Sequence, residues 1–485
     1  MLFNSLHYFV FFPIVVFVFF VLPQRWQMLW LFFVSLYFYA VFQFLYLFLL
    51  FYSIIVSYLS LKLILRFQNQ IHLKRFFLVL GIVGNLLLLL VFKYSVQVYD
   101  FLNFLLGFEP CDKDYIQPPN ILLPMGISFF TLQAISALVD VYRGVAEKPK
   151  NIFYFGLYLS FFPQLVAGPI LRTKELIAQF YERKSFSYEN FRLGLFQLCL
   201  GYMKKTLIAD PISPYVDRVF ASPWEFHTLS LWIAVFLFSI QIYGDFSGYS
   251  DIAIGTARIM GFSLPENFRR PFFSTTMSEF WRRWHISFSS WLRDYIYIPL
   301  GGSKVSSFRT YANLFITMII SGVWHGVGWH YLLWGSIHGF LLLFEKWILS
   351  FPFFGKINLP KMISKILGIF YTFWVFSFTF FFFRAKPLVF PENNLPLSAI
   401  DVGWYMTLRA FVYSPGEILI PSWHIFVMIG ILFGMEILFE KHSQSYFVHH
   451  WLKETRLYFF AGLILMTSFI IYSVSVSQPF VYFQF

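Results

Sequence analysis

Histidines give this sequence its clearest capacity for chemistry, because four of them lie inside strongly apolar stretches. They are His285 in residues 276–302 and, in residues 316–344, His325, His330 and His338. An imidazole held away from water tends to stay neutral, which is the form that can take a proton from an attacking hydroxyl. Acid–base catalysis of acyl or group transfer is therefore the first hypothesis for these two segments.

Metal ligation is the alternative use of clustered histidines. If residues 316–344 form one helix, His325 and His330 point about 140° apart, and His325 and His338 miss each other by a similar angle. No H-E-x-x-H pattern is present. The spacing therefore predicts no metal site and favours His325, framed by Trp324 and Trp329, as a general base.

Three glycines surround His325 in the stretch SGVWHGVG, namely Gly322, Gly326 and Gly328. Glycine leaves the backbone uncovered and so permits close approach of another group. That group is either a neighbouring helix or a substrate chain passing the imidazole, and the sequence leaves both open.

Residues 276–302 read TMSEFWRRWHISFSSWLRDYIYIPLGG and predict an interfacial helix over residues 276–300. Thr276 and Glu279 form a candidate capping box at its start. A helical period puts His285 on one stripe with aromatic and apolar side chains, while Arg282 and Arg293 point elsewhere, toward headgroups or a polar partner. The alternative for His285 is a core histidine satisfied by one hydrogen bond.

The composition of the whole chain predicts an integral membrane protein. The 485 residues are 58% hydrophobic and only 12% charged, too few polar groups for a soluble globule. The net charge of +12 comes from basic residues in short loops, which is typical of cytoplasmic loops and argues against nucleic-acid binding. Cys111 and Cys199 form neither a disulfide framework nor a metal cluster.

The positive-inside rule orients the first part of the chain. It puts Arg25, residues 62–75 and residues 143–150 in the cytoplasm, and the acidic loop of residues 100–114 outside. Residues 151–171 are apolar but interrupted by Pro163 and Pro169, which favours a re-entrant hairpin over a kinked helix. Non-helical backbone at membrane depth must be covered by protein or line a wet cavity.

Five motifs in order resemble the membrane-bound O-acyltransferase (MBOAT) family, in its bacterial branch of alginate and peptidoglycan O-acetyltransferase membrane subunits. They are LLPMGISFFTLQAISALVDVYRG at 122–144, FFPQLVAGPILR at 161–172, YGDFSGYSDIAIG at 243–255, FWRRWHISFSSWLRDYIYIPLGG at 280–302 and SGVWHGVGWHYLLWGSIHG at 321–339. The resemblance implies an all-α polytopic protein in which residues 1–485 form a single MBOAT membrane domain. It implies about 11–13 transmembrane helices with re-entrant and interfacial helices around a central tunnel.

The resemblance also implies roles for individual residues. The W-H-G histidine of the family falls on His325, which would be catalytic, and the W-H-x-S histidine falls on His285, on another part of the tunnel. Substrate contacts are expected at Trp324, Trp284, Arg282 and Arg293, whereas Glu279, Asp251 and Asp294 are expected to cap helices or pair charges. No bound cofactor or metal is expected, and acetyl-CoA is expected as the co-substrate.

The C-terminal tail, residues 479–485, has the form F-x-Y-x-x-F around Tyr482. An aromatic anchor at the membrane surface is the simpler interpretation. The tail also looks like the C-terminal motif of the small partner protein in the related D-alanyl transfer system. By that resemblance Tyr482 would be the hydroxyl that His325 deprotonates and would carry the acyl group.

The expected function is transfer of an acetyl group from cytoplasmic acetyl-CoA across the bacterial inner membrane to an exported polysaccharide resembling alginate or peptidoglycan. An extracytoplasmic partner of the SGNH type, by resemblance, would complete the transfer. The alternatives are another acyl donor or acceptor, D-alanyl or lipid, a polysaccharide or lipid transporter, and a scaffold without chemistry that recruits an acetyltransferase.

Overall fold

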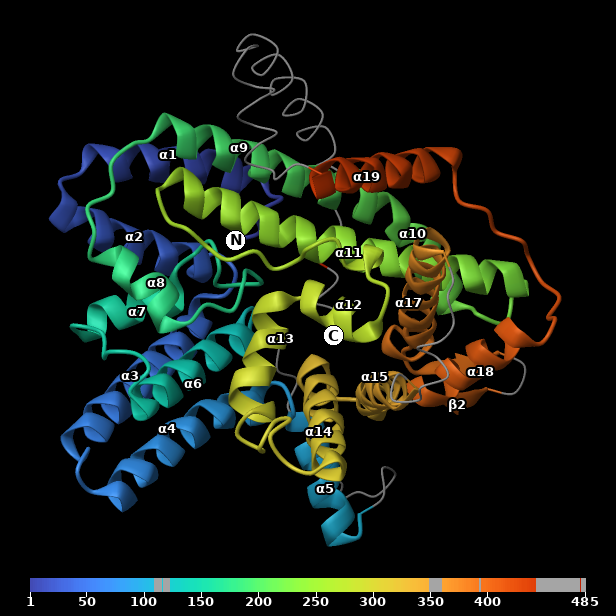
Figure 1. The fold of residues 1–485 in the computed structure, drawn as a ribbon, viewed down its shortest axis with the longest axis horizontal. Helices are drawn as coiled ribbons and strands as arrows, with labels where there is room; N and C mark the ends of the chain where they lie inside the picture. Colours follow the sequence, from blue (N-terminus) through green and yellow to red (C-terminus); the bar gives the residue numbers. More distant parts are fainter. Residues whose placement is uncertain (109–115, 117–122, 349–359, 392–393, 442–479, 481–485) are drawn as a thin grey trace. The chain divides into compact units, whose positions relative to one another are not determined.

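The computed structural model describes the chain except residues 109–115, 117–122, 349–359, 392–393, 442–479 and 481–485 (Figure 1). The described part is built from helices, with one two-stranded antiparallel hairpin, and confirms the all-α class. It forms two compact units. Unit 1 comprises Met1–Gly194 and Ala253–Pro265, and unit 2 comprises Leu195–Ile252 and Glu266–Phe485.

Unit 1 contains the N-terminal helices and the last turns of the long helix α11. Its elements are α1 (Leu6–Val21), α2 (Gln24–Ala40), η1 (Phe44–Tyr46), α3 (Leu47–Arg66), α4 (Ile71–Phe92), α5 (Ser95–Leu106), α6 (Ile127–Arg143), α7 (Ile152–Ser160), α8 (Thr173–Phe180), the start of α9 (Tyr188–Tyr202) and the end of α11 (Thr228–Ile259). Helices α3, α4 and α6 lie side by side (Figure 1). Between α3 and α4, the buried amide of Asn85 bonds Ser53 and Ser57, which satisfies its polar atoms inside an apolar bundle.

The expected interruption of residues 151–171 is present in unit 1. Helix α7 ends at Ser160, and the chain then runs without regular helix to α8, with nearly every side chain buried. The hydroxyl of Tyr158 donates to the Leu171 carbonyl at 2.7 Å, and the amide of Gln164 donates to the Tyr158 carbonyl at 2.7 Å. Protein groups thus cover this irregular backbone, as a membrane setting requires, while its re-entrant path stays a prediction.

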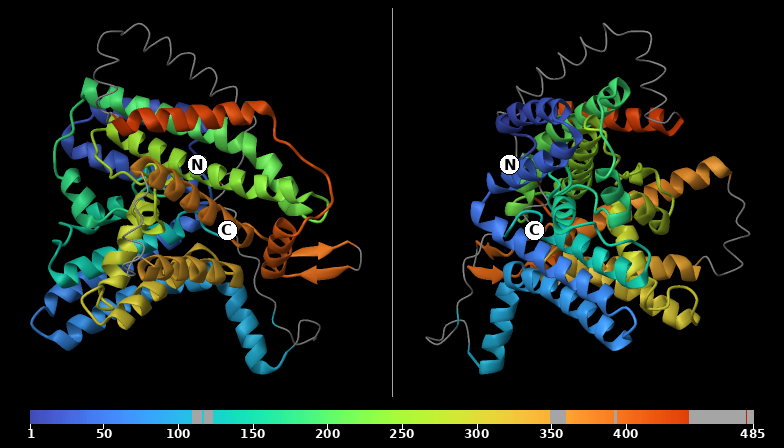
Figure 2. Two further views of the ribbon diagram at one scale, coloured as in Figure 1. Left: turned by 45° about the vertical axis from the view of Figure 1, so that its right-hand side comes forward. Right: turned by 90° about the vertical axis from the view of Figure 1, so that its left-hand side faces the viewer.

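Unit 2 carries the segments with the candidate histidines. Its elements are the rest of α9 and α11, the π-helical turn η2 (Met203–Ala209), α10 (Asp210–Ala221), η3 (Pro271–Phe273), α12 (Met277–Arg283), α13 (Ile286–Leu292), the π-helical turn η4 (Arg293–Tyr297), α14 (Ser307–His325), α15 (Trp329–Ile348), α17 (Lys361–Phe383), β1 (Leu388–Phe390), β2 (Leu395–Leu397), α18 (Ala399–Phe411) and α19 (Trp423–Lys441). Figure 2 shows the β1–β2 hairpin beside α18.

Residues 316–344 are two helices rather than one. Helix α14 ends at His325, Gly326 is extended, and α15 begins at Trp329. The two helices pack against each other (Figure 2). A Cβ on Gly322 would collide with the Tyr331 carbonyl, and one on Gly335 would lie 2.5 Å from the Met318 carbonyl. Of the two uses left open for Gly322, the structure therefore shows the close helix contact.

Four of the described helices are long and apolar enough to cross a membrane. They are Phe44–Arg66, Ile71–Phe92, Thr228–Ile259 and Lys361–Phe383, and the apolar helices α1 and Trp423–Leu438 of α19 are shorter. These spans support a membrane-integral chain, and the total of 11–13 spans stays a prediction.

Candidate active site

His325 is the last residue of α14 and lies at the corner of the α14–α15 hairpin, only 6% exposed. Four aromatic rings surround its imidazole at centroid distances between 5.0 and 5.6 Å. They belong to Trp324, Trp334, Phe288 and Phe383. The turn at Gly326 allows this position, because the helix must stop there for the chain to reverse into α15.

A small cavity opens beside His325. Its volume is about 20 Å³, and its walls are Ile242, Phe246, Trp284, His325, Trp334, Phe376, Phe380 and Phe383. This volume holds roughly one water molecule. The cavity beside His325 is too small for a thioester, which could reach the imidazole through it only if the aromatic walls move.

His285 divides the segment that the sequence predicted as one interfacial helix over residues 276–300. It adopts φ of +43° between α12 and α13, so the single continuous helix is wrong. The cap at Thr276 is confirmed, since its side chain accepts from the Glu279 amide. The predicted buried stripe is also confirmed, because His285 is 1% exposed and its apolar companions are buried as well: Trp281, Trp284, Phe288, Leu292 and Tyr295.

The imidazole of His285 is oriented by Asn267, a residue that no sequence pattern predicted at the site. Oδ1 of Asn267 lies 3.1 Å from Nδ1 of His285 and also accepts from the Ser287 amide at 3.2 Å and the Ser287 hydroxyl at 2.8 Å. Nδ2 of Asn267 donates to Ser250 Oγ at 3.0 Å. All four residues are buried.

This network fixes the tautomer of His285. A backbone amide can only donate, so the Asn267 atom that it reaches must be the oxygen, and an oxygen can only accept from Nδ1. Nδ1 therefore carries the hydrogen, and Nε2 is the accepting nitrogen of the neutral ring. Burial lowers the pKa of His285, which lies outside the four candidate spans, to about 3.

The two histidines that the sequence selected belong to one aromatic cluster. The rings of Phe288 and Trp324 stack at 4.1 Å, and each also contacts both imidazoles. Phe246 contacts His285 at 4.6 Å and lines the cavity beside His325. Trp324, expected at the substrate, is in this cluster, and Trp284 lines the cavity beside His325. Their role in binding stays a prediction.

His338 joins the cluster although the helical spacing separated it from His325. It is fully buried, and its Nε2 lies 3.2 Å from Oγ1 of Thr379, which also accepts from Nε1 of Trp334 at 3.1 Å. The Trp334 ring contacts both His325 and His338. The angle of about 140° between His325 and His338 assumed one continuous helix. It does not apply, because the helix breaks at Gly326 and a helical period cannot be continued across a break.

The arginines expected at the substrate lie away from the cavity. Arg282 is exposed, and Arg293 is 62% exposed and forms a 2.7 Å ion pair with Asp294. Neither residue lines the cavity beside His325. Glu279 behaves as a structural residue. Burial acts to raise the pKa of its carboxyl, but hydrogen bonds from Thr275 and Arg283 hold this pKa below the ordinary value.

An ionic network joins η2, α10 and α11 in unit 2, and Asp251 is the one member that the sequence predicted to be capping or charge-paired. Lys204 pairs with Asp251 at 2.8 Å, and Lys205 pairs with Asp210 at 2.8 Å and with Asp245 at 2.6 Å. The expectation that Asp251 is charge-paired is confirmed. The lysines come from the π-helical turn η2, whose extra residue per turn aims both toward α11.

The C-terminal tail is described only at Phe480, so Tyr482 lies outside the described residues. Phe480 is buried and contacts the rings of Phe246 at 5.8 Å and Tyr249 at 5.0 Å. Phe246 is the ring that touches His285. Phe480, two positions before Tyr482 in the sequence, therefore lies against the aromatic cluster.

Residues 127–384 match the membrane-bound O-acyltransferase family, MBOAT, and since this is more than half of the chain, the protein belongs to that family. The matched range includes His285, His325 and every residue that orients them. Family membership places this aromatic cluster in a class of membrane enzymes that transfer acyl groups to hydroxyls.

Three relatives show which acyltransferases the chain is similar to. The chain is similar to the probable alginate O-acetylase AlgI of Azotobacter vinelandii, with 38% identity over 70% of this chain and 63% of that protein. It is 32% identical to the peptidoglycan O-acetyltransferase of Helicobacter pylori, over 94% of this chain and 91% of that protein. It is 27% identical to the teichoic acid D-alanyltransferase of Bacillus subtilis, over 56% and 71%. The match covers less than two thirds of the length of the alginate relative.

Proposed function

We propose that this protein is an O-acetyltransferase that moves an acetyl group from cytoplasmic acetyl-CoA to an extracytoplasmic polysaccharide of the alginate or peptidoglycan kind. One observation carries the proposal: two buried imidazoles, His325 and His285, share one aromatic cluster inside the region that matches the acyltransferase family. The relatives named for acetylation match with higher identity than those named for D-alanylation, which supports an acetyl donor over a D-alanyl donor.

In the proposed reaction, neutral His325 takes the proton from an acceptor hydroxyl as its oxygen attacks the thioester carbonyl carbon. The carbon–sulfur bond breaks, an ester forms, and the thiolate of coenzyme A leaves and receives the proton. His285, which holds its hydrogen on Nδ1, offers Nε2 as an acceptor that can orient the incoming hydroxyl or the donor. Arg282 and Arg293 stay candidates for contacts with the phosphates of the donor.

The first acceptor hydroxyl is proposed to be that of Tyr482. The contact of Phe480 with Phe246 supports this, because it brings the tail to the ring that touches His285. The tyrosyl ester would then pass to an extracytoplasmic transferase, for which an SGNH-type partner is proposed, and on to the polysaccharide. The proposal implies a multi-pass subunit in the bacterial inner membrane.

The test is a His325→Ala variant assayed with labelled acetyl-CoA in purified, reconstituted protein. The expected result is loss of at least about 100-fold in acetyl transfer, as for removal of a general base. His330→Ala is the matched control, because it changes a histidine of the same motif that lies outside the cavity.

A folded His325→Ala protein with wild-type transfer would overturn the proposal. A transporter predicts no thioester cleavage by the purified wild-type protein, and a scaffold predicts that His325→Ala leaves polysaccharide acetylation in cells unchanged. The same assay with a D-alanyl thioester decides between the two acyl groups.

A further inference from the structure

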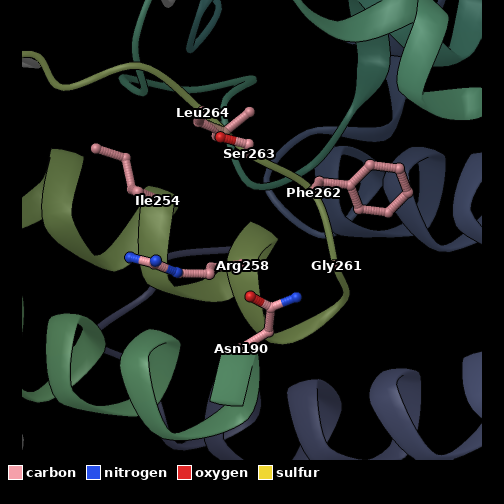
Figure 3. A pocket seen from close by; sticks show the side chains of 7 residues that line it. All are labelled: Asn190, Ile254, Arg258, Gly261, Phe262, Ser263 and Leu264. Carbon is pink, nitrogen blue, oxygen red and sulfur yellow. The ribbon is translucent and has the colours of Figure 1, made fainter. Parts of the chain in front are cut away.

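Unit 1 contains a pocket at the end of α11, separate from the cavity beside His325. Its volume is about 200 Å³, and it is lined by Asn190, Ile254, Arg258, Gly261, Phe262, Ser263 and Leu264 (Figure 3). The residues come from the start of α9, the last turns of α11 and the loop that follows. No residue of the proposed reaction lines it.

The walls of this pocket are held in place. Gln179 of α8 clamps the loop with two hydrogen bonds to Ser263, one accepted by the Ser263 carbonyl and one donated by its amide, both 2.8 Å. Gly261 turns the chain with φ of +83°, and the buried ring of Phe262 packs on Phe161 and Phe180. A site built this way needs little rearrangement to receive a ligand.

The polar groups of the pocket suit an anion. The half-buried guanidinium of Arg258 is its one charged side chain. The described ion pairs include none for Arg258. The exposed carboxylate of Glu189 attracts its guanidinium electrostatically. Asn190 projects from α9 toward the space between Arg258 and Gly261, and Ser263 lies above it (Figure 3). A guanidinium fork with nearby amide and hydroxyl donors matches the oxygens of a phosphate.

Arg258 lies close to one end of a helix of membrane-spanning length. It is in the last turn of α11, a 32-residue helix long enough to cross the membrane. A basic side chain at the end of such a helix places its charge at the interface. Its apolar neighbours Ile254, Phe262 and Leu264 would then face the less polar part of an amphiphile.

The segment after α8, which helps to hold the pocket, contacts residues 143–150, the loop that the positive-inside rule assigns to the cytoplasm. The Lys150 amide donates to the Tyr181 hydroxyl at 3.0 Å, and its ammonium lies 4.1 Å over the Tyr181 ring. Tyr181 directly follows α8, whose Gln179 holds the pocket loop. With residues 143–150 in the cytoplasm, as the positive-inside rule expects, the pocket would face the leaflet whose anionic lipids attract basic residues.

We propose that this pocket binds the phosphate of an anionic phospholipid of the cytoplasmic leaflet, with Arg258 as the paired cation. The same phosphate chemistry is present in free coenzyme A, but a pocket of 200 Å³ has no room for the whole of that molecule. A lipid needs to insert only its headgroup phosphate and the adjoining glycerol.

The experiment is native mass spectrometry and thermal melting of the full-length protein with added phosphatidylglycerol, phosphatidylcholine or coenzyme A. Wild-type protein is expected to retain phosphatidylglycerol in preference to phosphatidylcholine and to melt at a higher temperature with it. Arg258→Gln is expected to weaken the retention about tenfold, the loss of one charged hydrogen-bonded contact. Arg258→Lys recovers part of it.

Arg183→Gln is the matched control, because it removes the same charge from an exposed position outside the pocket. Asn190→Leu removes the amide donor at nearly the same side-chain size and without changing the charge, and it decides the matter if Arg258→Gln does not fold. Equal retention by wild type and both pocket variants overturns the proposal. Displacement of the lipid by stoichiometric coenzyme A overturns the lipid assignment and leaves a nucleotide phosphate site.

Discussion

At the scale of single residues, the orientation of the His285 ring depends on the side-chain amide of Asn267, whose Oδ1 contacts Nδ1 of the ring. Asn267 is itself oriented by Ser250, which accepts from Nδ2, and by Ser287, which donates to Oδ1. The Ser287 backbone amide excludes the flipped Asn267 amide, since a flip would place two donors face to face. The tautomer of His285 therefore depends on Asn267 and Ser287 rather than on the histidine alone.

Asn267→Leu should lower acetyl transfer by about 10- to 100-fold, because a misplaced catalytic group costs on this order. Asn267→Asp keeps the acceptor for Nδ1–H and so keeps the tautomer, but its negative charge favours the protonated ring. The pKa of His285 then rises, the neutral ring is lost at a higher pH, and the acidic limb of the pH–rate profile moves upward.

The measurement is the pH dependence of kcat and KM for acetyl transfer in both variants. A purely structural role for Asn267 predicts the same pH profile in Asn267→Asp as in wild type. Unchanged kinetics in Asn267→Leu would show that His285 needs no orientation.

At the scale of elements, the α14–α15 hairpin positions His325, and its glycines let the two helices approach. Gly322→Ala should lower the free energy of unfolding by about 1–3 kcal/mol, because the added methyl meets the Tyr331 carbonyl, which is backbone and cannot rotate away. Acetyl transfer should fall with it, since His325 is at the hairpin corner.

Gly430→Ala in α19 is the control, because nothing lies within 4 Å of a Cβ there. Thermal melting of both variants in the same detergent measures the difference. Equal melting temperatures would mean that the hairpin opens more easily than its packing indicates.

The ionic network between η2, α10 and α11 predicts a second effect at this scale. Lys205→Met removes the ammonium that lies between the carboxylates of Asp210 and Asp245, the second of which is buried. Breaking such a group costs about 3–5 kcal/mol. Removing one carboxylate as well, in Lys205→Met with Asp245→Asn, should recover part of the loss. Melting curves of the single and double variants test this, and a double variant less stable than the single would contradict it.

At the scale of the whole molecule, the proposed relay joins the aromatic cluster to the end of the chain. Incubation with labelled acetyl-CoA should add one acetyl group to the C-terminal peptide at Tyr482. Tyr482→Phe and His325→Ala should both abolish the label, for lack of the hydroxyl and of the base. Tyr413→Phe, at a 77% exposed tyrosine, should keep it. Peptide mass spectrometry reads the site, and a label that survives Tyr482→Phe would rule out the relay.

Much of the fold and part of the site could be predicted from the amino-acid order. Composition predicted a helical membrane protein, five motifs indicated the family, and the helical period predicted that His285 is buried while Arg282 is not. These predictions succeeded because each concerns a property that is set locally, by the apolar character and spacing of neighbouring residues along the chain.

The rest was decided by tertiary structure. The break at His285, the reversal at Gly326 and the contact of His338 with Trp281 of α12 are not properties of a single helix. A period calculated along one helix carries no information past its end. Asn267 is a polar residue in an irregular loop, where no period exists, and only the folded chain brings its amide to His285. The amino-acid order thus determined which side chains leave water, and packing determined which of them face each other.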